Sequence, residues 1–370
     1  MAEEAKNPRS LAAEKVCPAC NESYTDRNLV VCPRDRTMLL TPRMTDSWRR
    51  SVRSGERKHC RQCRGSFEIS QTICPNDGGV LEMYDGAVGE TALLEERFRP
   101  IEFVRDEPLF SLYSAIDEQE KRWVVIKLLR RELSCDEKTV SRFLKFAGPT
   151  RDLHHPNIIK IHSVNVTPEG DPYLISEYHS FKSLDQMTAG PVSLTPLYMV
   201  QIFSDVCRAL QYAHERNFFH GSLTPKNIYA DTSAAPAKGF IADFGVHERQ
   251  LRGVQWDGPS FETHTVNLYG DATSAAPELS AGKAPSAQSD IYQLGCAMYL
   301  TACGQSPFKR EKDLEVILAH MTDAPDQTLQ LAKHVPNEWK AVIYKCLSKL
   351  PEDRYKTAEE LRTVLEALPH

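Results

Sequence analysis

The sequence predicts an α+β chain in which two small cysteine-rich modules precede one larger domain. Three observations support this prediction. Short apolar runs typical of strands occur at 124–127 and 173–178, a helical repeat of apolar residues follows over 193–217, and six cysteines cluster in the first eighty residues. A chain of 370 residues is long enough for two or three domains and a packed core.

Composition and hydropathy predict a soluble, cytoplasmic protein. The charged first fifteen residues contain no apolar segment of the kind that directs secretion. The longest apolar stretch, 291–303, is shorter than the ~20 residues that a membrane span needs, so we expect no membrane association. The eleven cysteines are odd in number and partly at metal-like spacing, which favours a reducing compartment.

The cysteine clusters form an internal repeat with a period of a little over forty residues. Each copy has a Cys-x2-Cys pair, a third cysteine on a Cys-Pro turn, and an aspartate three residues after that cysteine. Thiolates at this spacing can bind one tetrahedral zinc ion, and a carboxylate oxygen is an acceptable fourth ligand. The expected ligands are Cys17, Cys20, Cys32 and Asp35 in the first copy, and Cys60, Cys63, Cys74 and Asp77 in the second.

The repeat resembles the paired zinc ribbons found ahead of some bacterial protein kinases, where a Cys-Pro-x-Asp-Gly ending recurs. This resemblance implies two structural zinc ions, because segments this small lack an adequate core without a metal. Buried free thiols are the alternative to a metal, and His59 is an alternative ligand to Asp77. The expected boundaries are a tail at 1–16, zinc ribbon 1 at 17–40, a basic linker at 41–59, zinc ribbon 2 at 60–81 and a second linker at 82–98.

Charge is distributed unevenly along the chain. Residues 1–81 carry a formal charge of +4 and the remainder carries −9, with the positive excess concentrated in 43–64. Such a basic run can contact nucleic acid, an acidic protein surface or the acidic part of its own chain. A solvated linker is the simpler interpretation.

The chemistry-bearing motifs lie within 218–245. Two short apolar runs flank a polar turn that holds His220, Ser222 and Asn227, and the second run ends on Asp-Phe-Gly at 243–245. Polar groups are therefore expected to converge at the ends of two strands. The spacing resembles the catalytic and metal-binding loops of the protein kinase family, H-R-D-L-x-x-x-N followed by D-F-G.

The resemblance covers residues 99–370 and implies a bilobal protein-kinase fold, with an N-lobe at 99–178 and a C-lobe at 179–370. In that family, the counterpart of Lys127 contacts ATP, and those of Asn227 and Asp243 hold magnesium. Retention of these three residues leaves weak binding of ATP and magnesium open. In the alternative interpretation, Asn227 and Asp243 only cap the local backbone.

Several residues that the family uses for phosphotransfer are replaced. Ser222 occupies the position of the aspartate that accepts the proton of the substrate hydroxyl, and the retained His220 is expected to be structural. Thr224 replaces the lysine that steadies the phosphoryl group, while Lys226 lies two residues further along. Asp271 replaces a threonine that helps to order the catalytic loop. No catalytic residue is therefore expected to be intact.

The N-lobe motifs are altered as well. Arg105, Glu107 and Phe110 replace the three glycines of the phosphate-binding loop, and the anionic Glu107 should repel phosphate. Phe146 stands where the family places the glutamate that holds Lys127. Scaffold residues, by contrast, are retained: Asp290 of the central helix, and the ion pair of Glu278 with Arg354.

These substitutions favour a pseudokinase, a catalytically impaired kinase-like protein that acts as a signalling scaffold or regulator with protein partners. One alternative is a weakly active Ser/Thr protein kinase with a relocated base, for example Asp231. A second alternative is a regulator whose zinc ribbons bind nucleic acid through the basic residues 43–64.

Overall fold

The structure is a computed structural model of the 370-residue chain. Beyond short strands in the first ninety residues and Ile73, it describes residues 93–107, 109–134, 137–167, 170–188, 194–246, 271–325 and 335–369. Contacts divide the chain into two units, the first comprising residues 1–135 and 167–178 and the second comprising 136–166 and 179–370. The chain thus passes from the first unit to the second between residues 178 and 179.

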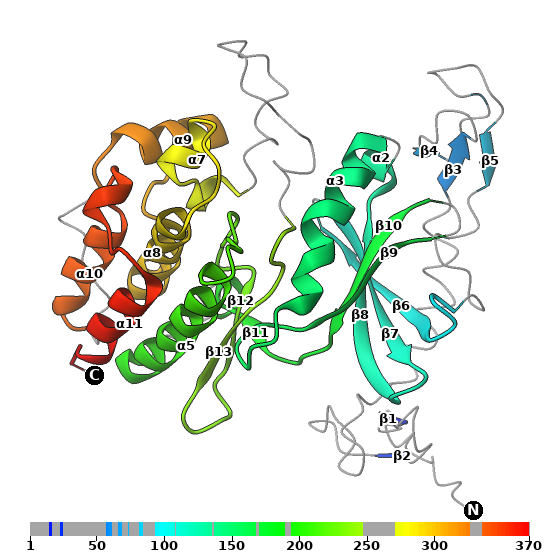
Figure 1. The fold of residues 1–370 in the computed structure, drawn as a ribbon, viewed down its shortest axis with the longest axis horizontal. Helices are drawn as coiled ribbons and strands as arrows, with labels where there is room; N and C mark the ends of the chain where they lie inside the picture. Colours follow the sequence, from blue (N-terminus) through cyan, green and yellow to red (C-terminus); the bar gives the residue numbers. More distant parts are fainter. Residues whose placement is uncertain are drawn as a thin grey trace, which may run out of the picture. The chain divides into compact units, whose positions relative to one another are not determined.

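The first unit is built on an antiparallel sheet, in which the strands follow the order β6–β7–β8–β10 (Figure 1). These strands are β6 (Phe98–Asp106), β7 (Phe110–Asp117), β8 (Arg122–Leu129) and β10 (Pro172–Glu177), and the short helix α2 (Arg131–Ser134) follows β8. Apolar side chains from all four strands form its core. The strand predicted at 124–127 is therefore confirmed as part of β8.

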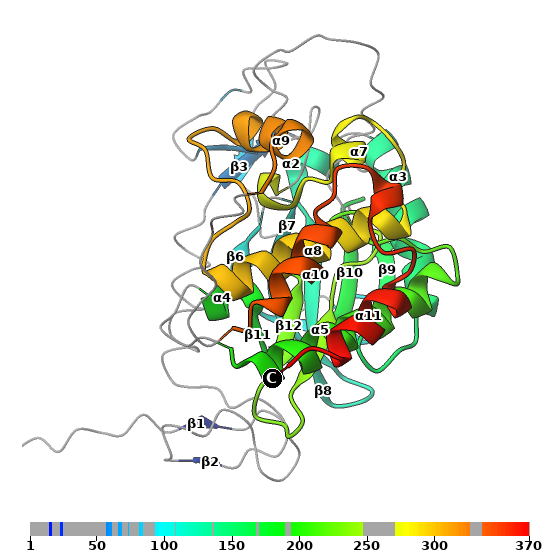
Figure 2. The same cartoon turned by 90° about the vertical axis from the view of Figure 1, so that its left-hand side faces the viewer.

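The second unit is mainly helical (Figures 1 and 2). Its first elements are α3 (Glu137–Ala147), η1 (Gly148–Asp152), β9 (Ile161–Val166), β11 (Lys182–Ser183), α4 (Leu184–Thr188), α5 (Pro196–His214), β12 (Ile228–Asp231) and β13 (Lys238–Ile241). They are followed by η3 (Ala272–Ser274), α7 (Pro277–Ser280), α8 (Ala287–Cys303), α9 (Asp313–Thr322), α10 (Glu338–Cys346), η4 (Pro351–Asp353) and α11 (Ala358–Glu366). Helix α5 packs against α8, α11 and β13, and α10 packs against α8.

Local sequence explains where the two long helices begin and end. Helix α5 begins at Pro196 because Thr195 caps it, accepting a hydrogen bond from the Tyr198 amide, so it is slightly shorter than the predicted 193–217. Helix α8 begins with a capping box made by Ser286, and ends at Gly304 in the left-handed conformation (φ 73°). Almost every residue of α8 is buried, which makes it the central helix of this unit.

The cysteine modules are described only in part. In the first, β1 (Lys15–Val16) pairs with β2 (Ser23–Tyr24), and in the second, β3 (Arg57–Cys60) pairs with β4 (Ser66–Glu68) and β5 (Leu81–Met83). The two modules share one register, since Val16 pairs with Ser23 as His59 pairs with Ser66. In sequence, each Cys-x2-Cys pair thus falls between two antiparallel strands whose paired residues are equivalent in the two modules. Of the expected zinc ligands, Cys60 ends β3 and the other seven lie outside the described residues.

No helix among the described residues is long and apolar enough to cross a membrane.

His320 is a buried histidine that makes folding sensitive to pH. Its Nδ1 atom lies 2.9 Å from the hydroxyl oxygen of Tyr292, and neither ring is exposed to solvent. Burial, together with the nearby Lys349 charge, lowers the pKa of His320 to about 3. The unfolded chain therefore binds this proton below about pH 6.5, whereas the folded chain does not, and stability is lost as the pH falls towards 3.

We expect the free energy of unfolding to fall by about 2 kcal/mol more between pH 7 and pH 5 in the wild type than in His320→Gln, because glutamine does not titrate. Urea unfolding at both pH values measures this difference. Between pH 9 and pH 7 the two proteins should change in parallel, which serves as the internal control. Equal slopes between pH 7 and pH 5 would contradict the assignment of a neutral buried imidazole.

Candidate functional site

Two loops meet at one end of the β12–β13 hairpin. The polar turn leads into β12 at Ile228, and the segment that begins at Ala242 follows β13. Because Ile228 pairs with Ile241 in the antiparallel ladder, the start of β12 lies beside the end of β13. The Ala242 amide donates a hydrogen bond of 2.9 Å to the Asn227 carbonyl. The predicted convergence of the polar groups is thus confirmed.

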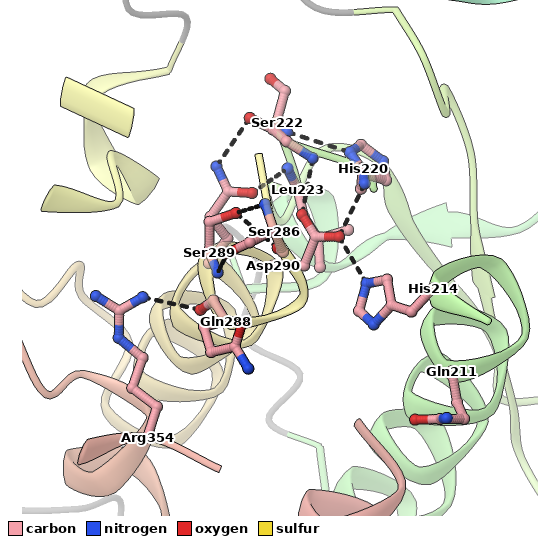
Figure 3. Close-up of polar contacts among 12 residues, drawn as sticks. Gln211, His214, His220, Ser222, Leu223, Ser286, Gln288, Ser289, Asp290 and Arg354 are labelled. Carbon is pink, nitrogen blue, oxygen red and sulfur yellow. Dashed lines mark hydrogen bonds and ion pairs between the residues drawn. The ribbon is translucent and has the colours of Figure 1, made fainter. Parts of the chain in front are cut away.

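Asp290, at the start of helix α8, forms hydrogen bonds with the polar turn that holds His220 and Ser222 (Figure 3). Its Oδ2 atom accepts hydrogen bonds of 2.8 Å from the His220 amide and from His214 Nε2, and its Oδ1 atom accepts one of 2.7 Å from the Gly221 amide. The Asp290 side chain is fully buried. Burial pushes the pKa of this carboxyl up, but the His214 hydrogen bond and the other donors outweigh it, so the pKa lies below its usual value.

His220 is also fully buried and bridges the two loops. Its Nε2 atom lies 2.9 Å from the Ala242 carbonyl oxygen, and its Nδ1 atom accepts a long hydrogen bond of 3.4 Å from the Ser222 amide. A neutral ring with the proton on Nε2 satisfies both contacts. Burial lowers the pKa of His220, which keeps it neutral. These contacts fit the structural role expected from the sequence.

Ser222 lies at the top of the same turn, half-buried (Figure 3). In the described part of the chain both of its hydrogen bonds are made by its backbone, since its amide donates to His220 and its carbonyl accepts from Asn227 Nδ2 at 3.1 Å. Gln293 of α8 completes the turn by accepting a hydrogen bond of 3.0 Å from the Leu223 amide. The turn is thus closed by contacts that do not depend on the side chain at 222.

Asn227 uses both ends of its side-chain amide within the turn. Its Oδ1 atom accepts a hydrogen bond of 2.8 Å from the Thr224 amide, while its Nδ2 atom donates to the Ser222 carbonyl. These contacts cap the local backbone, and magnesium would bind through the oxygen that Thr224 already uses. Among the described residues no group of three or more His, Cys, Asp or Glu side chains is arranged to hold a metal.

The segment after β13 has an unusual backbone. Asp243 adopts a positive φ of 66°, which is uncommon for a residue other than glycine, and its half-buried side chain belongs to the same end of the hairpin. Gly245 has φ 69°, and a Cβ atom there would lie 2.4 Å from the Phe146 carbonyl oxygen of α3. Glycine is therefore required at 245 by both conformation and space. Phe146 lies in α3, whose acidic residue is the exposed Glu137.

An ion pair that was not anticipated joins the turn to the segment before α7. Lys226 Nζ lies 2.8 Å from Asp271 Oδ2, and Asp271 Oδ1 accepts hydrogen bonds from the amide and the hydroxyl of Thr273. Burial raises the pKa of Asp271, but the bonds to Lys226 and Thr273 outweigh it and leave the pKa below its usual value. The displaced lysine and the new aspartate, which the sequence presents as two separate losses, are complementary in charge.

Asp231, considered as a relocated base, lies at the opposite end of β12 from the turn. Its Oδ1 atom accepts hydrogen bonds from the amide and hydroxyl of Ser233 and from the Ala234 amide. The Asp231 side chain therefore stabilises the loop that connects β12 to β13.

In the first unit, Lys127 lies on β8 between Leu112 of β7 and Leu174 of β10. The residue is only 6% exposed. Its Nζ atom lies 4.0 Å from Glu107 Oε2, and Glu107 Oε1 in turn accepts a hydrogen bond of 2.6 Å from Arg105. The residue that replaces a glycine of the phosphate-binding loop is thus placed beside the lysine of β8.

The predicted scaffold ion pair is present. Arg354 donates two hydrogen bonds to Glu278, of 2.7 and 2.9 Å, and three more to backbone carbonyls of Gln288, Ser348 and Lys349. Both side chains are buried. Removal of one member of such a pair costs ~3–5 kcal/mol, because the other charge is left buried without a partner.

Residues 111–364 match the family model described as protein kinase domain. Serine/threonine-protein kinase PknB of Mycobacterium tuberculosis is 30% identical over 277 residues, which cover 74% of this chain and 43% of PknB. PknB of Mycolicibacterium smegmatis aligns with the same identity and coverage. The chain therefore spans less than half the length of these curated relatives.

Solved structures with similar folds include two crystal structures of the PknI kinase domain of Mycobacterium tuberculosis. One is 22% identical with a TM-score of 0.56, and the other is 20% identical with a TM-score of 0.55. The comparisons cover 76% of this chain and 98% and 99% of the respective PknI chains. At this identity the likeness concerns the fold alone, and it confirms the predicted bilobal α+β fold with a sheet N-lobe and a helical C-lobe.

We expect Asp290→Asn to lower the free energy of unfolding by about 2–4 kcal/mol. The carboxylate offers two acceptor oxygens to three N–H groups, whereas the side-chain amide of asparagine offers only one. Urea unfolding measures the loss, and hydrogen exchange at the His220 and Gly221 amides should accelerate. Asp152→Asn, at an exposed position, is the matched control. Wild-type stability and exchange in Asp290→Asn would show that this carboxylate does not brace the turn.

Proposed function

The chain belongs to the protein kinase family, and we propose that it is a pseudokinase, a kinase-fold protein that does not transfer phosphate and serves as a scaffold or regulator for protein partners. The curated relatives carry the name of serine/threonine-protein kinases. The chain shares their domain but differs at the residues that the chemistry needs.

The proposal depends on Ser222, which lies in a turn whose backbone hydrogen bonds are in place. The backbone of the turn is held by Asp290, His220 and Gln293, so a serine at 222 is not the consequence of a collapsed loop. A neutral hydroxyl has no useful proton affinity at pH 7. A positioned general base typically contributes ~10²- to 10⁴-fold in rate, and Ser222 cannot supply that factor.

Other carboxylates near the turn are poorly suited to replace the base. Asp290 is fully buried and accepts three hydrogen bonds. Asp271 is engaged by Lys226 and Thr273, and its lowered pKa makes it a weaker proton acceptor. Asp231 is engaged in the β12–β13 connection. These engagements support the pseudokinase over a kinase with a relocated base.

Weak phosphotransfer is the competing function, because Lys127, Asn227 and Asp243 are all retained. If ATP bound with magnesium, Asn227 and Asp243 would be the residues to hold the ion, and the ion would neutralise phosphate charge. The Asn227 amide oxygen accepts one hydrogen bond from the Thr224 amide and keeps a second lone pair, so a labelled-phosphate assay is needed to separate the two functions.

We further propose that the N-terminal modules bind two structural zinc ions. The equivalent register of the strands that flank the two Cys-x2-Cys pairs supports this, since it agrees with the internal repeat in the sequence. Cysteine thiolates would supply most of the ligands and fold each module around its ion. The modules would then offer a second binding surface, and nucleic-acid binding through residues 43–64 stays a prediction of the sequence.

We expect the purified chain to transfer no labelled phosphate from ATP with magnesium, either to itself or to a generic protein substrate. Scintillation counting against Asp243→Ala measures the background, because that variant lacks the residue that the family uses for magnesium. Equal counts for the two proteins support the pseudokinase. Wild-type counts well above those of Asp243→Ala would establish an active kinase.

Metal analysis should find two zinc ions per chain. Each of Cys20→Ser and Cys63→Ser is expected to lose one ion, because three remaining ligands hold zinc weakly. Native mass spectrometry counts the ions directly, and Cys303→Ser, at a half-exposed cysteine of α8, is the matched control. A wild-type chain that purifies without zinc and takes up none would rule out the metal assignment.

A further inference from the structure

The hairpin between β6 and β7 carries a carboxylate that faces two cations. Glu107 Oε2 lies 4.0 Å from Lys127 Nζ, and Glu107 Oε1 accepts hydrogen bonds of 2.6 and 3.2 Å from the Arg105 guanidinium. The side chain of Lys127 is 8% exposed and that of Glu107 is 27% exposed. Water therefore screens the contact between Lys127 and Glu107 less than it screens a fully exposed ion pair, whereas the Arg105 side chain is 50% exposed.

We propose that Glu107 is a built-in competitor for the phosphate groups of nucleotides at Lys127. Proteins commonly hold phosphate with lysine and arginine side chains that converge on one anion. Here Lys127 and Arg105 converge on an anion that belongs to the chain itself. An incoming triphosphate has to displace this carboxylate or lie beside a like charge, and both reduce its affinity.

The backbone of the hairpin holds Glu107 in this position. Its amide donates a hydrogen bond of 2.7 Å to the Phe110 carbonyl, which closes a short turn. Next to it, the hydroxyl of Ser111 donates a hydrogen bond of 2.6 Å to Asp106, whose residue pairs with Ser111 in the ladder. Asp106 adds a second carboxylate to the same turn. The turn therefore presents negative charge where the family's glycines present backbone amides to phosphate.

Competition by Glu107 should affect ligands according to the number of phosphate groups that they carry. The penalty depends on phosphate charge, so it is largest for ATP, smaller for ADP and absent for adenosine. Removal of the Glu107 charge takes away the carboxylate that contacts both Lys127 and Arg105. The inference concerns the binding of nucleotide, whereas the proposed function concerns its chemistry.

The test compares the full-length wild type with Glu107→Gln, which removes the charge and keeps the shape. Isothermal titration with ATP, ADP and adenosine should show at least tenfold tighter ATP binding by the variant, a smaller gain for ADP and adenosine affinity within about twofold. The double variant Glu107→Gln/Lys127→Met should lose the gain. Glu118→Gln makes the same change of charge at a carboxylate paired with Lys121 at the other end of β7 and should gain nothing.

An ATP affinity that is unchanged in a folded Glu107→Gln variant overturns the inference, and so does an equal gain for adenosine, which would mean that Glu107 acts by steric exclusion. Glu107→Ser provides a second variant if the glutamine variant does not fold. Because Ser222 is unchanged, Glu107→Gln should bind ATP without transferring phosphate. A variant that binds and transfers would contradict the proposed function alone, while one that does neither would contradict this inference alone.

Discussion

The buried carboxylate of Asp290 is the constraint on which the candidate site depends. A carboxylate without access to water is tolerated only when its oxygens are hydrogen-bonded, and three N–H groups meet that need here. Two of these groups are backbone amides of the turn, at His220 and Gly221, so α8 helps to set the course of the turn independently of the side chain at 222. The third, from His214, ties the end of α5 to the same carboxylate. A serine at 222 therefore fits a loop that would equally carry an aspartate.

Burial of charge also distinguishes the retained residues from the replaced ones. Arg354 and Glu278 are buried, and loss of either would leave the other charge in a medium that cannot solvate it. Ser222, by contrast, is half-buried and makes its described hydrogen bonds through its backbone, so the turn does not depend on its side chain. The residues that stabilise the domain and those expected to carry phosphotransfer are therefore different residues of this chain.

Much of the fold could be predicted because it depends on regular patterns. The β8 strand, helix α5 and the meeting of the two loops follow from apolar periodicity and from the spacing of His220, Asn227 and Asp243. The contacts of Lys226 with Asp271 and of Lys127 with Glu107 could not be predicted in the same way. They join side chains distant in sequence, and the ends of long side chains are placed by rotamers that local sequence does not specify. Considered alone, the residues at 107 and 271 each resemble the loss of a functional residue. In the structure, the carboxylates of Glu107 and Asp271 each contact a lysine.

Retention of a residue is consequently weak support for retention of its role. Asn227 is explained by the turn alone, since both ends of its amide are bonded within it. Lys127 is buried in the sheet and faces an internal carboxylate. Gly245 is required by its positive φ and by the close approach of the α3 backbone, whether or not a metal binds beside it. Asn227 and Gly245 thus have structural reasons to persist that involve neither ATP nor magnesium.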